Sequence, residues 1–324
     1  MTKRQTAGRL FPPIKPYNSG YLSVGDGHEI YYEECGNPKG VPVLYLHGGP
    51  GAGCDEDTRR FFDPKKCCII VFDQRGSGRS KPYASIYANT TQHLAEDINK
   101  LLTGLGKKKV VLFGGSWGST LALVYAIAYP KKVMGMVLRG IFLAESKECL
   151  DYLSGQTAHS RFPEICERFL NNVPEDARKN PADYYFAMMS SGDQKTRRKF
   201  AYEWSFYESA RLRLIPPPEN ELKKEILSES FVSLATMEAH YIRNLCFLED
   251  GFILKNVHRI PRIPISIIHG RYDDLCSVES AIRLHRRLPT SKLHIVTAGH
   301  SRTDPEILKK LVQETDLIIS GLGK

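Results

Sequence analysis

The chain has 324 residues, of which 42% are hydrophobic, and a formal net charge of +9 at pH 7. This length allows one large hydrophobic core, or a core with a smaller lid, and no stretch is apolar for long enough to cross a bilayer. The basic residues are scattered among acidic ones, and no P-loop, zinc-finger or RNA-recognition pattern occurs. We therefore interpret the charge as a solvated surface and expect neither a nucleic-acid nor a membrane partner.

Residues 1–9 are polar and basic and lack the apolar run of a secretory signal. The eight cysteines show neither a C-x-x-C pair nor the spacing of a disulfide framework, and we expect no metal site. These features predict a cytoplasmic protein. They leave its oligomeric state open.

The first predicted elements are two strands, at residues 20–24 and 28–33, joined by Asp26-Gly27, a dipeptide typical of hairpin turns. Strands then alternate with helices. Further strands are predicted at residues 41–46, 67–72, 110–113, 133–138, 265–268 and 293–296, and helices at 92–105, 121–129, 278–288 and from Asp304-Pro305 onward. This alternation predicts an α/β fold with a mostly parallel central sheet covered by helices on both faces.

Between residues 142 and 258 the strand signals stop, and a polar segment with helical periodicity and several prolines replaces them. Its position between two predicted sheet strands favours an all-helical lid resting on the strand ends, where open α/β sheets bind ligands. A separate domain with its own role is the alternative. We therefore predict a core of residues 1–141 and 259–324 with a lid of residues 142–258.

Residues 114–118 (GGSWG) join a buried strand directly to a buried helix. A serine on such a sharp turn has a strained backbone and an exposed hydroxyl, and the small flanking glycines leave room for the neighbouring strand and helix. The helix also directs unpaired N–H groups toward any oxyanion formed nearby. The pattern predicts that Ser116 is a nucleophile.

A serine nucleophile needs a base, and the base needs an orienting acid. In this architecture the three follow in the order serine, acid, histidine, each after a strand. Of the ten histidines, elimination leaves His300, on the loop between the last predicted strand and the last helix. The acid should follow the strand at 265–268. We favour Asp273, and the spacing leaves Asp274 as an open alternative.

The oxyanion of a tetrahedral intermediate needs two backbone donors. The N–H of Trp117, directly after the nucleophile, is one candidate. The other should come from the glycine-rich segment 47–51 (HGGPG), which follows the strand at 41–46. Since Pro50 has no N–H, either Gly49 or Gly48 must supply it, and we favour Gly49.

Four segments together resemble the proline iminopeptidase family of the α/β-hydrolase superfamily: 47–51 (HGGPG), 73–80 (DQRGSGRS), 114–119 (GGSWGS) and 138–142 (LRGIF). The resemblance runs from about residue 10 to the C-terminus. It implies an α/β-hydrolase fold and a cytosolic serine exopeptidase, without cofactor or metal, that removes N-terminal proline from small peptides. It agrees with a triad of Ser116, Asp273 and His300, and with an oxyanion hole of Gly49 and Trp117.

The lid carries two further segments of this resemblance. Residues 204–208 (WSFYE) resemble the family's W-x-x-W-E motif, and residues 237–241 (MEAHY) resemble its I-E-x-H-Y motif. The resemblance implies that Glu208 and Glu238 bind the substrate's α-ammonium group, for which paired carboxylates in a partly dry cleft are suited. It also implies that Arg139 and Phe142 face the prolyl residue.

Two positions depart from the family pattern. Tyr207 stands where the family usually has tryptophan, and Ile242 stands where it usually has phenylalanine. Both changes bear on the pocket around the pyrrolidine ring and neither touches the triad, so they leave open whether proline, hydroxyproline or alanine is preferred.

Two alternative functions have to be distinguished from that of an exopeptidase. A carboxylesterase, or another serine hydrolase acting on a non-peptide ester, would use the same elbow, and Glu208 with Glu238 are the features against it. A non-catalytic hydrolase-like receptor would keep the fold without turnover. Labelling of Ser116 by a fluorophosphonate discriminates against the receptor.

Overall fold

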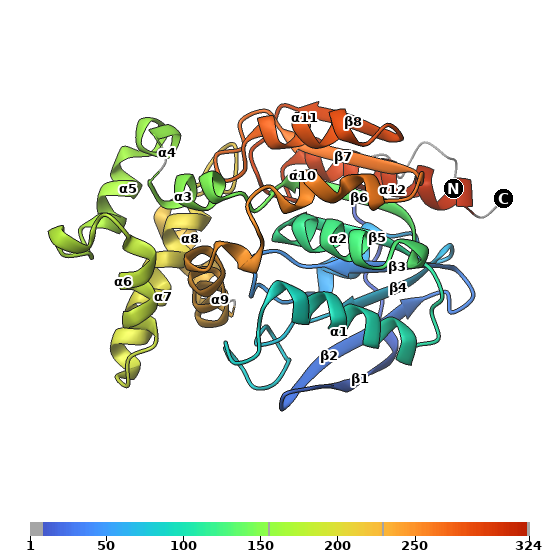
Figure 1. Ribbon diagram of the computed structural model, residues 1–324, viewed down its shortest axis with the longest axis horizontal. Helices are drawn as coiled ribbons and strands as arrows, with labels where there is room; N and C mark the ends of the chain where they lie inside the picture. The colour runs from blue at the N-terminus through green and yellow to red at the C-terminus, as the bar shows by residue number, and fades with distance from the viewer. Residues whose placement is uncertain (1–8, 155, 229, 323–324) are drawn as a thin grey trace.

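The computed structural model describes residues 9–154, 156–228 and 230–322, so the segment considered as a secretory signal lies, apart from Arg9, outside the described residues. An eight-stranded sheet in the order β1-β2-β4-β3-β5-β6-β7-β8 runs through the molecule (Figure 1). Its strands are β1 (Pro16–Gly25), β2 (His28–Gly36), β3 (Val41–Leu46), β4 (Cys67–Phe72), β5 (Val110–Ser116), β6 (Val133–Ile141), β7 (Ile265–Gly270) and β8 (Ser291–Val296).

The pairing of the strands confirms the predicted α/β class. All neighbours from β4 to β8 are parallel, whereas the β1–β2 hairpin and the β2–β4 pair are antiparallel. The hairpin turns at Asp26 and Gly27, both with positive φ, as a tight two-residue turn requires. Strands β3 and β4 have the predicted bounds, whereas the other strands extend beyond the predicted segments, and β6 continues to Ile141.

Both faces of the sheet are covered by helices because side chains alternate along each strand. Leu44 and Leu46 of β3 lie in one hydrophobic cluster with α1 (Thr91–Gly104), α2 (Trp117–Ala128) and α11 (Val278–Arg287). Val43 and Tyr45, one residue out of phase, lie in another cluster with α12 (Pro305–Leu322) on the opposite face. The result is a three-layered core (Figure 1).

The chain changes direction in the sheet between β3 and β5. After β3 it adds β4 on one side and then crosses over to add β5 on the other side. Loops at the carboxyl ends of two such strands diverge and leave a crevice where α/β proteins bind ligands. The segment 47–51 follows β3 at this crevice, and the Ser116 turn follows β5.

Helices fill the chain between β6 and β7, and all of them but α10 lie beside the core, toward the left of Figure 1. They are α3 (Ser146–Ser154), α4 (Gln156–Arg161), α5 (Pro163–Leu170), α6 (Pro181–Met189), α7 (Gln194–Ser209), α8 (Glu219–Ser228), α9 (Phe231–Arg243) and α10 (Phe252–Asn256). Helices α5 to α9 share a hydrophobic cluster of their own, centred on Trp204 and Phe169. Helix α10 packs on α2 of the core. The boundaries of a lid at 142–258 stay a prediction.

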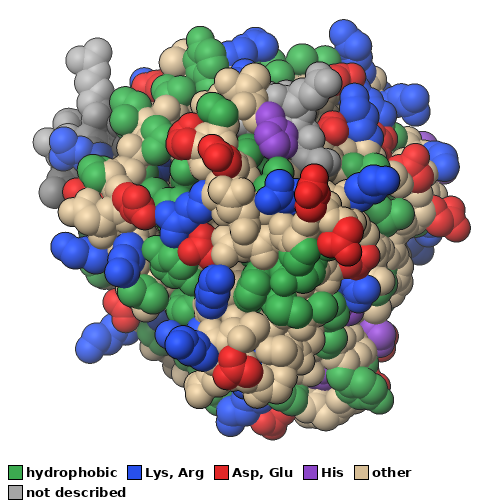
Figure 2. Space-filling view, turned by 90° about the vertical axis from the view of Figure 1, so that its left-hand side faces the viewer, with side chains coloured by type: hydrophobic (Ala, Val, Ile, Leu, Met, Phe, Trp, Pro, Cys, Tyr) green, Lys and Arg blue, Asp and Glu red, His purple; other side chains and the backbone are tan. Residues whose placement is uncertain are grey.

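The surface agrees with the interpretation of the net charge. On the face shown in Figure 2, which is the lid end of the molecule, Lys and Arg side chains are interspersed with Asp and Glu. Among the helices of the described residues, none combines the length and the hydrophobicity that a membrane span needs.

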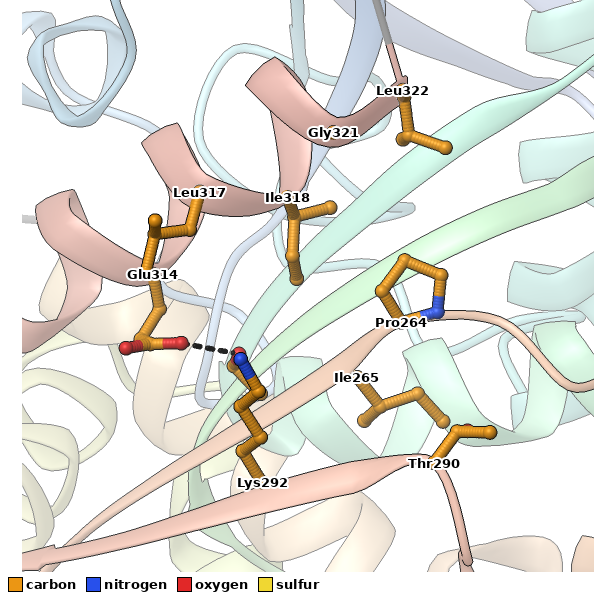
Figure 3. Close-up of a pocket in the computed structure, with 10 residues that line it drawn as sticks. Pro264, Ile265, Thr290, Lys292, Glu314, Leu317, Ile318, Gly321 and Leu322 are labelled. Carbon is orange, nitrogen blue, oxygen red and sulfur yellow. Dashed lines mark hydrogen bonds between the residues drawn. The ribbon is translucent and has the colours of Figure 1, made fainter. Parts of the chain in front are cut away.

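A hollow of about 310 Å³ lies between β7, β8 and α12 (Figure 3). Its polar part is a hydrogen bond of 2.9 Å from the Ser266 hydroxyl to Glu314. Residues 264–266, which line it, stand where β7 begins. This hollow is therefore at the edge of the sheet opposite to the one from which Asp273 follows β7.

Candidate active site

Ser116 lies on a strained turn between β5 and α2. Its φ of 57° and ψ of −129° are rarely adopted by residues other than glycine, and its side chain is half-buried. A Cβ on Gly114 would approach the Gly118 oxygen to 2.2 Å, and one on Gly118 would approach the Leu46 oxygen of β3 to 2.1 Å. Only glycine fits at these two positions, which is the geometry expected of a nucleophile elbow.

The loops after β7 and β8 bring an acid and a base together. Nδ1 of His300 lies 2.7 Å from Oδ2 of Asp273, and both side chains are buried. The other oxygen, Oδ1 of Asp273, accepts from the backbone N–H groups of Leu275 and Cys276. Asp274 points elsewhere, since its carboxylate pairs with Arg211 at 2.7 Å. Of the two candidate acids, Asp273 is therefore the one on His300.

Asp273 is held as a carboxylate. Burial raises its pKa, but the charge and hydrogen bond of His300, with smaller contributions from His269 and the Cys276 N–H, outweigh burial and lower the pKa to about 2. Burial also lowers the pKa of His269, whose Nδ1 accepts from the Ile141 N–H. Proton transfer through His300 requires such a negatively charged acid, because the acid orients the imidazole.

Arg139, at the carboxyl end of β6, forms a hydrogen bond with the other ring nitrogen of His300. Its guanidinium donates to Nε2 at 2.9 Å and to the His300 carbonyl at 3.0 Å. Because arginine can only donate, Nε2 is the acceptor and the ring proton is on Nδ1, facing Asp273. Within the described residues there is no hydrogen bond between Ser116 and His300, and the Ser116 hydroxyl lies close enough to the Cys276 thiol to affect the pKa of that thiol, which burial raises.

The chain of β6 passes very close to the base. Gly140 has a φ of +54°, and a Cβ there would approach Cε1 of His300 to 2.8 Å and Nδ1 to 3.0 Å. A larger residue would displace the imidazole from Asp273. This contact explains in physical terms why the segment 138–142 has a glycine at position 140.

The glycine-rich loop after β3 lies against the elbow. A Cβ on Gly48 would be 3.5 Å from Cβ of Ser116, so the backbone of this loop borders the nucleophile directly. Its first residue, His47, accepts from the Gln74 N–H at 2.9 Å, and the Gln74 side chain also accepts from the indole of Trp117 at 3.0 Å. Gln74 thus connects the two segments from which we expect the oxyanion donors.

The lid places two carboxyl groups side by side over this region. Glu208 of α7 and Glu238 of α9 are both buried and are hydrogen-bonded to each other. Glu238 also accepts from the Trp204 indole at 2.7 Å and lies 3.5 Å from the Tyr152 hydroxyl. Glu208 lies within electrostatic reach of His300 and Arg139, so a positive charge on either would lower its pKa, which relates this pair to the base.

Burial raises the pKa of both carboxyls, and for Glu238 the negative charge of Glu208 raises it further. Two buried carboxyls that share a hydrogen bond hold a proton between them when no cation is present. A cationic group in reach of both would replace that proton and pair with the negative charge. The arrangement is therefore suited to binding a small cation.

Three other residues that the sequence analysis names, Phe142, Tyr207 and Ile242, lie near the site. Phe142 is half-buried, packs on the core, and accepts at its carbonyl from Thr120 at 2.6 Å. Tyr207 is buried in the lid cluster, 4.4 Å from the Phe169 ring, and its hydroxyl donates to the Tyr152 carbonyl at 3.0 Å. Ile242 packs at the border of both clusters.

Three residues of this region are not among those predicted from the sequence. Tyr152 beside Glu238, Arg211 on Asp274, and Cys276 beside Ser116 all lie outside the motifs on which the predictions rest. Cys276 follows Asp273 by three residues, so its closeness to the acid could have been inferred. The other two depend on how lid helices pack, for which the sequence carries no signal.

Comparison with known proteins adds to this geometry. The family model of the alpha/beta hydrolase fold matches residues 41–302. The chain is 42% identical over 315 residues to a probable proline iminopeptidase of Leptolyngbya boryana, covering 96% of this chain and 97% of that protein. It is 43% identical over 309 residues to a proline iminopeptidase of Xanthomonas citri, covering 95% and 98%. A solved structure of a proline iminopeptidase-related protein from Thermus thermophilus has a TM-score of 0.62 at 22% identity, covering 94% of this chain and 98% of that one.

Proposed function

The chain belongs to the proline iminopeptidase family of the α/β hydrolases, and we propose that it is a serine exopeptidase that releases N-terminal proline from peptides. The observation that carries the proposal is the buried pair Glu208 and Glu238, which forms no ion pair with a Lys or Arg of the described residues and of which Glu208 lies within electrostatic reach of His300. An exopeptidase must recognise a free amino terminus, which is positively charged. An ester substrate need not carry a positive charge at that position.

In the proposed reaction the Ser116 hydroxyl attacks the prolyl carbonyl while Nε2 of His300 takes its proton. The C–N bond then breaks, and the same proton passes from His300 to the leaving nitrogen of the shortened peptide. Water hydrolyses the prolyl ester on Ser116 and releases proline. Asp273 stabilises the imidazolium in both halves, which its low pKa supports.

Before that transfer, Arg139 must release Nε2 of His300. In the structure the lone pair that would receive the Ser116 proton accepts from the guanidinium at 2.9 Å. We propose that the entering prolyl residue displaces Arg139 from this contact, in agreement with the family position of Arg139 and Phe142 beside the substrate.

The tetrahedral oxyanion would be stabilised by the N–H groups of Trp117 and Gly49. The closeness of the loop 47–51 to Ser116, and the anchoring of both segments by Gln74, support this assignment. Ser233 at the start of α9 lies 3.0 Å from the Gly51 carbonyl, so the lid helix that carries Glu238 also contacts the oxyanion loop.

The substrate's ammonium group would lie between Glu208 and Glu238 and displace the shared proton. The indole of Trp204 fixes the orientation of Glu238 by its hydrogen bond of 2.7 Å. A cytoplasmic location is also part of the proposal, because the eight cysteines show no spacing of a disulfide framework.

A panel of naphthylamides tests the substrate directly. Prolyl-naphthylamide should be cleaved, its N-acetylated form should be cleaved at least about 100-fold more slowly because it carries no charge, and the alanyl compound should report the pyrrolidine preference. Equal turnover of the free and the N-acetylated prolyl compounds would show that the lid carboxylates do not select an amino terminus. Cleavage of simple esters with no cleavage of any naphthylamide would favour an esterase.

A further inference from the structure

The segment of residues 211–214, which we name the strap, directly follows α7 and contacts both catalytic loops. The N–H of Arg211 donates to the Glu208 carbonyl at 2.9 Å, so the strap begins on the last turn of the helix that carries a substrate carboxylate. Its course from there to the loop of His300 joins the lid to the core.

The side chain of Arg211 binds the loop of the catalytic acid. Its Nε donates to Oδ2 of Asp274 at 2.7 Å and one terminal nitrogen donates to the Asp274 carbonyl at 3.1 Å. The guanidinium also lies over the Tyr207 ring, 4.5 Å from its centre, and donates to the Tyr152 carbonyl at 3.3 Å. Both members of the ion pair are almost fully buried, with 1% and 2% of their side chains exposed.

The backbone of the strap binds the loop of the catalytic base. The Leu212 carbonyl accepts from the N–H groups of both His300 and Ser301, each at 2.8 Å. Two residues further on, the N–H of Leu214 donates to Asp304, which also accepts from the Gly299 N–H at 2.6 Å. The residues that precede and follow His300 are therefore fixed by the same short segment.

In the part of the chain that the structure describes, the backbones of the two catalytic loops are hydrogen-bonded to each other only before the catalytic residues. The N–H of Tyr272 donates to the Ala298 carbonyl at 3.0 Å, one residue ahead of Asp273 and two ahead of His300. Beyond this bond, the hydrogen bond of 2.7 Å between the side chains of Asp273 and His300 joins the two loops. The strap contacts both loops on this far side.

From these contacts we infer that Arg211 is a positioning residue, which through Asp274 and the strap holds Asp273 and His300 in register with each other and with Glu208. The inference rests on the proposed function for the identity of the substrate. A forked guanidinium that binds both a carboxylate and a main-chain carbonyl fixes the direction of a loop as well as its distance.

The inference also explains Tyr207, which departs from the family pattern. Its ring lies under the Arg211 guanidinium and its hydroxyl binds the same Tyr152 carbonyl as Arg211 does. The tyrosine is buried and belongs to the support of the acid loop.

The test compares the wild-type protein with the double variant Arg211→Met, Asp274→Asn. Removing only one partner would leave a buried charge without its main partner and could unfold the protein, whereas the double variant keeps similar side-chain sizes and removes both buried charges. It leaves only Arg161, whose side chain is 45% exposed and lies 3.8 Å from Asp274, without that contact. The matched control is Arg213→Met, two residues along the strap, where the arginine pairs with Glu225 and both side chains are partly exposed. Folding of every variant is verified by circular dichroism and thermal unfolding.

The readout is the rate at which a fluorophosphonate labels Ser116, measured over a range of pH. The probe carries no ammonium group, so it reports the triad and not the lid carboxylates. We expect the double variant to be labelled on the order of 100-fold more slowly, since about 1 Å of misplacement has that effect on a catalytic group. We also expect the pH of half-maximal labelling to move, because the 2.7 Å hydrogen bond between Asp273 and the base would be weakened. A smaller folded fraction would lower the amplitude without moving that pH.

Arg211→Lys sharpens the result, because it keeps the positive charge without the fork and should recover only part of the labelling rate. Labelling of the folded double variant within about twofold of wild type, with an unmoved pH midpoint, would overturn the inference. If the wild-type protein is labelled but releases no proline, the proposed function is wrong, while the comparison of labelling rates still decides the role of Arg211.

Discussion

The sheet core and the lid contribute to one site in different electrostatic states. In the core, the charged acid already has its partners: Asp273 is paired with His300 and two backbone N–H groups, and its pKa is low. In the lid, Glu208 and Glu238 face each other without an ion pair to any Lys or Arg of the described chain, and their pKa values are raised. The difference indicates that the core supplies the chemistry and the lid selects the substrate by its positive charge.

Ser116→Ala gives the largest expected effect and tests the core. Removing the nucleophile should lower kcat for prolyl-naphthylamide by at least ~10⁴-fold, because no other group can form the acyl intermediate. Binding of prolinamide, measured by calorimetry, should remain, since the lid carboxylates are intact. Residual turnover above about one hundredth of wild type in a purified, contaminant-free sample would mean that another residue carries the reaction.

Glu238→Gln tests the lid. We expect kcat/KM for prolyl-naphthylamide to fall by about 100- to 1,000-fold, because the ammonium loses half of its negative partner in a buried setting. The rate with N-acetyl-prolyl-naphthylamide should change little. Glu203→Gln on α7 is the matched control, since Glu203 pairs with Arg168 at the lid surface. An equal loss of kcat/KM with both substrates would mean that Glu238 stabilises the fold and does not recognise the ammonium group.

Glu148→Gln tests the junction of lid and core. Burial raises the pKa of Glu148 to about 7, against an ordinary value of 4.5. Between these values the folded state binds a proton that the unfolded chain does not, so Glu148 should make the free energy of unfolding fall by about 3 kcal/mol as pH rises from 4.5 through 7. Glutamine can keep the contacts to Ser280 and to the N–H groups of Leu143 and Glu145.

The variant should therefore equal wild type in stability near pH 4.5 and exceed it by roughly that amount at about pH 8. Urea unfolding at the two pH values checks the difference. A constant gap between the two proteins at both pH values would contradict the assigned titration.

Tyr207→Phe gives the smallest expected effect. It removes one hydrogen bond to the Tyr152 carbonyl, which still accepts from Arg211, so the free energy of unfolding should fall by about 1 kcal/mol. The value of kcat/KM should stay within about threefold of wild type. A much larger loss of activity with unchanged stability would show that the tyrosine faces the substrate, as its place in the family motif suggests.

The same comparison explains how far the sequence could predict the molecule. In the core, hydrophobic alternation and the glycine spacing of the elbow are local signals, so the sheet and Ser116 could be predicted from neighbouring residues. His300 could be predicted from the order of the triad along the chain and by elimination of the other histidines. The choice between Asp273 and Asp274 could not, because both stand on one loop and the decision depends on Arg211, more than sixty positions away in the chain.

In the lid, the sequence predicts helices but not their contacts. Glu208 and Glu238 are identified only through resemblance to a family, since a glutamate on an amphipathic helix is normally solvated. Tyr152 carries no such pattern and reaches Glu238 only because α3 packs beside α9. The contact of Arg139 with His300 likewise depends on a side-chain conformation that no spacing encodes.

The most direct measurement follows fluorophosphonate labelling and prolyl-naphthylamide cleavage in one sample, with the labelled peptide mapped by mass spectrometry. We predict one label per chain, on Ser116, and a loss of cleavage in proportion to the label. Full labelling with activity retained, or a label on the neighbouring Cys276 that accounts for the loss, would contradict the assignment of the nucleophile.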